Sequence, residues 1–181
     1  DLSIIIQERK GDVVISINSS TALEELAQSY SCNVSRARLG KTFITLDKLS
    51  GIYATEPSKV IDSDWGMWED GMYAAIKLVN HMSVNNLDMQ DMIDDVPKKS
   101  YLQNNIFLEA FDSGLLKEKA LKILGEPLEI QEIDGLRLIY SDSWVLFRAS
   151  GTEPKCRIYV ESDSVQRSLE LMKKSETVLL N

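Results

Sequence analysis

The chain has 181 residues and a hydrophobic content of 44%, enough for one large globular domain or two small ones. Its formal net charge of −8 argues against a general nucleic-acid or anionic-membrane binder. No apolar run reaches the roughly 18 residues of a membrane span, and the N-terminal residues lack the basic start of a signal peptide. Cys32 and Cys156 lie far apart without metal-site spacing, so we expect a reduced, cytoplasmic protein.

The first half of the chain alternates short apolar strands with amphipathic helices. The expected elements are the end of a helix at 2–9, a strand at 13–17, a helix that opens with a capping box at 21–24, a strand at 33–37, a helix at 43–49 and a strand at 51–54. Strand, helix and strand within so few residues imply a parallel βαβ unit. We therefore expect an α/β domain with a mixed, largely parallel sheet and helices on both faces.

A polar stretch separates this half from the rest of the chain. Before it, a helix is predicted over residues 72–81, with a core-facing stripe of Ala75, Ile76 and Val79. Residues 85–99 then have little pattern beyond a short helix and contain a proline, which indicates a linker. The chain is accordingly predicted to form two domains, 1–97 and 98–181.

The second half predicts a small α+β domain with an antiparallel sheet backed by helices. The expected elements are a helix at 115–124, strands at 128–133 and 136–140 around an Asp134-Gly135 hairpin turn, strands at 144–148 and 156–161, and a last helix from about residue 163. The apolar positions expected along this last helix are Val165, Leu169, Met172 and Leu179.

The loop between the last two strands suits an oxyanion. Residues 148–157 have the sequence RASGTEPKCR, with an arginine at each shoulder. Gly151 permits the positive φ that lets successive N–H groups point into one concavity, and the hydroxyls of Ser150 and Thr152 add donors. Arg148 and Arg157 can each offer a planar fork to phosphate oxygens. From the residues alone, an ordinary hairpin with solvated arginines is an equally open interpretation.

Arg-x-Ser-Gly-Thr-Glu-Pro followed by Arg-x-Tyr-x-Glu resembles the phosphate-binding loop in the C-terminal domain of the α-D-phosphohexomutases. That family includes phosphomannomutases, phosphoglucomutases and phosphoglucosamine mutases. The resemblance extends to Glu56-Pro57-Ser58, similar to a loop that contacts sugar hydroxyls, to Asp70-Gly71 before a helix, and to the turn at 38–41, similar to another loop facing the cleft. It covers nearly all of this chain and about half of the parent protein. The resemblance implies that residues 1–97 are most of the sugar-recognition third domain, without its N-terminal part, and that residues 98–181 are the C-terminal fourth domain.

The resemblance implies a role for each matching residue. The non-reacting phosphate of the phosphosugar would be held by Arg148, Ser150, Gly151, Thr152 and Arg157. Glu56 and Ser58 would bind sugar hydroxyls, and Lys41 and Lys59 would be cations near the cleft. Two plainer interpretations stay open, because Glu56 can be a solvated loop carboxylate and Lys41 an ordinary surface lysine.

The groups that perform the chemistry in this family are not found in the sequence. The resemblance implies a phosphorylated serine in the first domain and a Mg²⁺ ion held by Asp-x-Asp-x-Asp in the second, and Asp62-Ser63-Asp64 is only a fragment of that pattern. We therefore expect no catalytic residue and no metal ligand here. The chain alone is predicted to be inactive, with a phosphosugar and the N-terminal domains of the same enzyme as partners, and neither nucleic acid nor membrane.

One departure from the family pattern affects the predicted function. The family continues Glu-x-Ser with Gly-His, whereas this chain has Lys59-Val60. The favoured hypothesis is the substrate-binding part of a phosphohexomutase that interconverts the 1- and 6-phosphates of mannose or glucose. A fragment of a phosphoglucosamine mutase and a non-catalytic phosphosugar-binding module are the alternatives.

Overall fold

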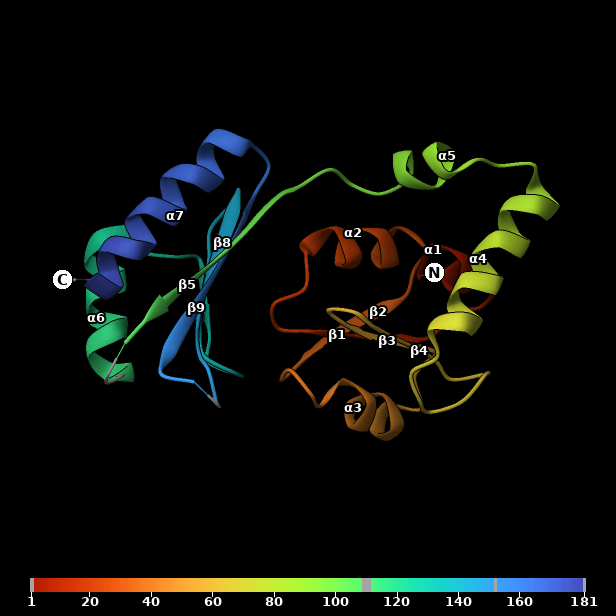
Figure 1. Ribbon diagram of the computed structural model, residues 1–181, viewed down its shortest axis with the longest axis horizontal. Helices are drawn as coiled ribbons and strands as arrows, with labels where there is room; N and C mark the ends of the chain where they lie inside the picture. Colours follow the sequence, from red (N-terminus) through yellow and green to blue (C-terminus); the bar gives the residue numbers. More distant parts are fainter. Residues whose placement is uncertain (1, 109–111, 152, 181) are drawn as a thin grey trace. The chain divides into compact units, whose positions relative to one another are not determined.

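The computed structural model of the protein describes residues 2–108, 112–151 and 153–180 (Figure 1). The chain divides into two compact units, with the boundary between Pro97 and Lys98. Within the described residues, no helix combines the length and the apolar character that crossing a membrane requires.

The first unit is built on a four-stranded sheet in the order β2-β1-β3-β4. The strands are β1 (Asp12–Ser16), β2 (Asn33–Ala37), β3 (Tyr53–Glu56) and β4 (Lys59–Asp62). β1 pairs in parallel with β2 and β3, whereas β4 forms an antiparallel hairpin with β3. The predicted mixed, largely parallel sheet is confirmed.

Helices cover both faces of this sheet, and the alternation of side chains along β1 explains why (Figure 1). On one face, Val13 and Ile15 pack with α1 (Leu2–Glu8) and α2 (Thr21–Ser29). On the other, Val14 packs with Leu46 of α3 (Thr42–Leu49). A strand buried on both faces needs apolar residues at successive positions, which is the pattern of this segment.

The start of α2 differs from the predicted capping box. Ser20 is the N-cap, and its hydroxyl accepts the N–H of Ala22 at 3.1 Å. Glu24 forms a two-pronged ion pair with Arg36 of β2, with 2.9 Å from Nε to Oε1 and 2.8 Å from a terminal nitrogen to Oε2. The carboxylate of Glu24, which the local spacing predicts to cap the helix start, instead links α2 to β2 of the sheet.

The predicted core-facing stripe of α4 (Gly71–Asn85) is wrong. Ile76 is 69% exposed and Val79 is 64% exposed, and none of the residues of this fully described helix is buried. The helix begins at the N-cap Asp70, whose carboxylate accepts the N–H of Tyr73 at 2.9 Å. Periodicity therefore predicts the helix correctly, but which face is covered depends on tertiary contacts. The short helix α5 (Met89–Asp94) follows.

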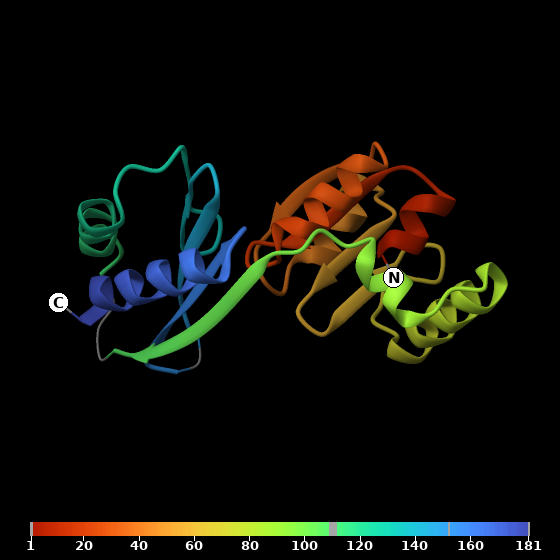
Figure 2. The same ribbon diagram turned by 90° about the horizontal axis from the view of Figure 1, so that it is seen from above.

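The second unit is a five-stranded antiparallel sheet in the order β5-β9-β8-β7-β6. Its strands are β5 (Ser100–Phe107), β6 (Glu129–Gln131), β7 (Leu136–Ile139), β8 (Ser143–Ala149) and β9 (Lys155–Ser162). Two helices, α6 (Ser113–Leu124) and α7 (Val165–Leu180), lie on the same face of the sheet (Figures 1 and 2). The predicted α+β unit is confirmed.

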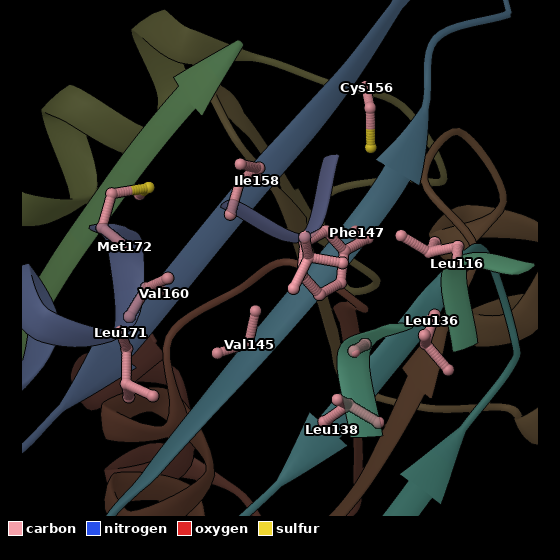
Figure 3. Packing of buried hydrophobic residues seen from close by; sticks show 12 residues of the cluster. Leu116, Leu136, Leu138, Val145, Phe147, Cys156, Ile158, Val160, Leu171 and Met172 are labelled. Carbon is pink, nitrogen blue, oxygen red and sulfur yellow. The ribbon is translucent and has the colours of Figure 1, made fainter. Parts of the chain in front are cut away.

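The core of this unit lies between the sheet and its two helices (Figure 3). Val145 and Phe147 of β8 point to the same side as Ile158 of β9, as the two-residue period of a strand requires. Leu171 and Met172 of α7 close the core. Val165 and Leu169, expected along the apolar face of this helix, are 65% and 56% exposed instead.

β4 and β5 are absent from the elements that the sequence predicts. β4 follows a two-residue turn so closely that its four residues look like the continuation of a loop. β5 alternates half-buried and exposed positions, but its centre, Gln103-Asn104-Asn105, is polar. It is an edge strand with one partner, β9, so it has less apolar surface to bury than a central strand.

Candidate functional site

Glu56, at the end of β3, is held by the turn that precedes α3. Its Oε1 accepts hydrogen bonds from the N–H of Gly40 at 2.7 Å, the N–H of Thr42 at 3.3 Å and the hydroxyl of Thr42 at 2.8 Å. Lys41 is the N-cap of α3 and makes no capping bond through its side chain. The carboxylate of Glu56 therefore caps the helix from a neighbouring strand, where the helix dipole favours a negative charge.

Local backbone geometry fixes both loops around this carboxylate. The N–H of Lys41 donates to the carbonyl of Arg38 at 3.0 Å, and Gly40 between them has a φ of 77°, which glycine adopts without strain. Pro57 and Ser58 form the two-residue turn of the β3–β4 hairpin, and Ser58 has a φ of 66°. The turn at 38–41 and the Glu-Pro-Ser loop, far apart in sequence, thus lie together in the fold.

A small pocket opens beside the Glu56 carboxylate. It is lined by Gly40, Thr42, Phe43, Ala54, Thr55, Glu56, Lys59, Ile61 and Glu69. The ammonium of Lys59 pairs with Glu69 at 2.7 Å, and the hydrogen bond and charge of Glu69 raise the pKa of Lys59. An anion in this pocket would therefore compete with Glu69 for Lys59. Lys41 is exposed at the start of α3.

Arg148 and Arg157 lie directly opposite each other on β8 and β9 of the second unit. The loop between the two strands is closed by a hydrogen bond of 2.9 Å from the N–H of Ser150 to the carbonyl of Lys155. Ser150 is half-buried and Gly151 is exposed. The predicted phosphate ligand Thr152 lies outside the described residues.

The two arginines differ in what their Nε atoms contact. The Nε of Arg148 donates to Oδ2 of Asp134 at 2.7 Å. The Nε of Arg157 is buried and has no hydrogen-bond partner in the described part of the chain. A buried donor without a partner is costly, and a hydrogen bond donated to an anionic ligand would remove this cost. Both guanidinium groups therefore lie beside the loop that the sequence predicts to bind an oxyanion.

The pairing of Asp134 with Arg148 is not predicted from the sequence, where Asp134-Gly135 indicates only a hairpin turn. The two residues are 14 positions apart, and no helical or strand period links them. The sheet register brings them together, because β7 pairs with β8. Thr42, which holds Glu56, is missed for the same reason. Signals of this kind appear only once the strand order is known.

The two carboxylates of Asp62-Ser63-Asp64, the fragment of a metal-binding pattern, form ion pairs with basic side chains of the same chain. The buried Asp62 accepts hydrogen bonds from Lys77 at 3.0 Å and from the hydroxyl of Tyr73 at 2.8 Å, and it pairs with Arg9. Asp64 also pairs with Arg9. Among the described residues, no three His, Cys, Asp or Glu side chains gather as a metal-binding group. These aspartates do not fit the role of magnesium ligands.

Two family descriptions match the chain. Residues 3–100 match "Phosphoglucomutase/phosphomannomutase, alpha/beta/alpha domain III" and residues 97–176 match "Phosphoglucomutase/phosphomannomutase, C-terminal domain". The chain belongs to this family. It comprises domains III and IV of an α-D-phosphohexomutase. The two matches overlap at residues 97–100, and the boundary between the two compact units falls within this overlap.

Sequence similarity to a curated relative supports the family assignment. A probable phosphoglucosamine mutase of Pyrococcus horikoshii is 32% identical over 180 residues, which cover 94% of this chain and 39% of that protein. The chain therefore spans about two fifths of the length of this relative.

Solved structures share the fold. A phosphoglucomutase/phosphomannomutase family protein of Burkholderia thailandensis superposes with a TM-score of 0.79 at 18% identity, over 98% of this chain and 41% of that one. Aspergillus fumigatus N-acetylphosphoglucosamine mutase, in complex with GlcNAc-6P and magnesium, superposes with a TM-score of 0.66 at 12% identity, over 98% of this chain and 42% of that one.

Proposed function

We propose that this chain is the phosphosugar-binding part of a phosphohexomutase, which interconverts hexose 1-phosphates and hexose 6-phosphates through a phosphoserine enzyme. The observation that carries the proposal is the pairing of Arg148 with Arg157 beside the Ser150-Gly151 loop, in a chain that belongs to this family. Two guanidinium forks and the N–H groups of a tight loop are complementary to the oxygens of a phosphate.

The contribution of this site to catalysis is to orient the sugar. A phosphate held by Arg148 and Arg157 is the one that does not react, so its binding energy fixes the position of the hydroxyl at the other end of the sugar. The free oxygen of the Glu56 carboxylate and the hydroxyl of Ser58 are proposed to bind sugar hydroxyls. Thr152 and the cations Lys41 and Lys59 stay predicted contacts of the phosphosugar.

Magnesium would be bound outside this chain. When bound, such an ion neutralises charge on the transferred phosphoryl group. Asp62 and Asp64 are committed to Arg9 and Lys77. We therefore propose that the ion and the phosphoserine are supplied by the N-terminal domains of the same enzyme, which are its protein partner. A cytoplasmic location also stays a prediction.

Glucosamine phosphate is the second candidate substrate. It is favoured by the 32% identity of this chain to the probable phosphoglucosamine mutase of Pyrococcus horikoshii. A non-catalytic phosphosugar-binding module is the third candidate, suggested by Lys59-Val60 in place of Gly-His. Phosphate binding alone does not separate these candidates, so the test must compare sugars.

The test is an amide NMR titration of the chain with mannose 1-phosphate, glucose 6-phosphate and glucosamine 6-phosphate. We expect saturable shifts at Ser150 and Gly151 with all three ligands, and shifts near Glu56 that differ between sugars. Arg157→Ala should weaken binding at least about ten-fold, since charge-assisted bonds to the phosphate are lost. Arg167→Ala is the matched control, because this arginine lies on α7 and pairs with Asp142, which directly precedes β8. Equal binding by both variants would contradict the proposal.

Catalysis is tested separately with the rest of the enzyme. The chain alone should show no mutase turnover, and adding the N-terminal domains of a relative should restore it. Turnover by the chain alone would disprove the assignment of the phosphoryl carrier to another segment. No turnover in the reconstituted enzyme, with phosphosugar binding intact, would favour the non-catalytic module.

A further inference from the structure

We propose that Asp134 is a positioning residue for phosphate binding, which acts by holding the guanidinium of Arg148. This inference rests on the function proposed above, because Arg148 must be a phosphate ligand for its position to matter. The carboxylate contacts Nε of Arg148 at 2.7 Å. This bond occupies one of the five N–H donors of the guanidinium and leaves the four on the terminal nitrogens for phosphate oxygens.

The surroundings of the pair make this contact stronger than an ordinary surface ion pair. The side chain of Arg148 is 17% exposed and that of Asp134 is 13% exposed. Reduced access of water strengthens a charge-assisted hydrogen bond. An arginine that is already ordered loses less conformational freedom when a ligand binds, so the phosphate is bound more tightly.

Asp134 is itself fixed by the turn in which it lies. The next residue, Gly135, has a φ of 106°, a backbone conformation that residues with a side chain rarely adopt. A Cβ on Gly135 would lie 2.3 Å from the carbonyl oxygen of Phe147, which directly precedes Arg148. The turn between β6 and β7 therefore packs against the backbone of β8 at the arginine, and the carboxylate is placed by backbone contacts.

Arg148 and Arg157 lie directly opposite each other on the neighbouring strands β8 and β9, so their positive charges repel. Asp134 offsets one of these charges. This creates two opposite expectations for its removal. If Asp134 only cancels charge, a variant without the carboxylate should bind phosphate more tightly. If it positions Arg148, the same variant should bind phosphate more weakly.

The test compares Asp134→Ala and Asp134→Asn with the unmodified chain, using inorganic phosphate and glucose 6-phosphate as probes in NMR titrations. Asp134→Ala should weaken binding of both about ten-fold, the cost of an unheld arginine. Asn keeps a side-chain oxygen that can accept from Nε, so Asp134→Asn should recover most of the affinity. The control is Asp142→Ala, which removes the carboxylate beside Arg167 in the same unit.

A second readout reports the position of Arg148 directly. The Nε–Hε signal of Arg148, assigned by its loss in Arg148→Lys, should be sharp in the unliganded chain and broadened in Asp134→Ala. A residue needed only for folding would not change this signal in a variant with an otherwise unchanged amide spectrum. If Asp134→Ala does not fold, Asp134→Ser replaces it, because serine suits a turn but is too short to reach Nε.

The outcomes separate this inference from the proposed function. No phosphate binding by the unmodified chain would overturn both. Binding by the unmodified chain with equal or tighter binding by Asp134→Ala would overturn the positioning role alone. Weaker binding by Asp134→Ala, recovery by Asp134→Asn and a broadened Arg148 signal together would establish it.

Discussion

The two oxygens of the Glu56 carboxylate have different surroundings. All three hydrogen bonds from Gly40 and Thr42 go to Oε1. Among the described residues none donates a hydrogen bond to Oε2, which is the oxygen proposed to bind a sugar hydroxyl. A side chain proposed to bind sugar is therefore also a helix cap, and its loss should affect folding as well as binding.

Substitution of Glu56 can separate these two roles. Glu56→Ala should lower the free energy of unfolding by about 1–3 kcal/mol, because the buried N–H and hydroxyl of Thr42 and the N–H of Gly40 lose their acceptor. Glu56→Gln keeps a carbonyl oxygen at that position and should cost less than about 1 kcal/mol. Urea unfolding at pH 7 measures both. Glu69→Ala is the control, since the half-exposed side chain of Glu69 pairs with the equally accessible Lys59, and its cost should stay within about 0.5 kcal/mol. Equal stability of Glu56→Ala and Glu69→Ala would exclude the capping role.

At the scale of elements, Asp62 connects three parts of the first unit. It lies at the end of β4, Lys77 and Tyr73 belong to α4, and Arg9 directly follows α1. Burial acts to raise the pKa of Asp62, but hydrogen bonds from Lys77 and Tyr73, with the charge of Arg9, hold it below its usual value. Since α4 has no buried residue, these polar contacts help to attach it to the sheet.

The depressed pKa of Asp62 predicts a pH dependence of stability. A carboxyl with a lower pKa in the folded state contributes stability above its unfolded pKa, near 4, and loses that contribution as the pH falls through the folded value. Asp62→Asn should therefore cost about 1–3 kcal/mol at pH 7, and the difference from the unmodified chain should shrink towards pH 3. Urea unfolding at both pH values tests this.

The neighbouring Asp64→Asn is the control for this experiment. Its side chain is 72% exposed, so its loss should change stability by less than about 0.5 kcal/mol. A cost for Asp62→Asn that does not depend on pH would show that its charge has no part in attaching α4.

At the scale of the whole molecule, each unit has a core made from its own residues. The core of the second unit draws on α6, α7 and the strands β7, β8 and β9. The two cores of the first unit are formed by residues between Leu2 and Met67. Each unit thus has the main requirement of an independent domain.

The second unit should therefore fold without the first. Residues 98–181, produced alone, should give a dispersed amide spectrum and one cooperative urea transition, because their apolar core is complete. A collapsed spectrum or a gradual transition would contradict this. If the fragment folds, it should retain binding of inorganic phosphate at the Arg148–Arg157 loop, and Arg157→Ala within the fragment is the control.

The sequence by itself determined much of this protein. The near-continuous apolar runs of β1 and β8 and the alternation in β7 and β9 predict buried strands, and the stripes of α2 and α6 predict helices, because burial imposes those patterns. The residue types of the loop from Arg148 to Arg157 suit a phosphate, but its prediction as a phosphate site depends on the resemblance to the α-D-phosphohexomutases.

The tertiary structure alone decided what depends on strand order and packing partners. No local pattern predicts the exposure of α4, the strands β4 and β5, the capping of α3 by Glu56 or the bond between Asp134 and Arg148. Each joins positions that are distant in sequence or depends on which surface is covered, and a hydrophobic stripe is the same whether it is buried or exposed. Local propensity selects the element, and long-range contacts select its neighbours.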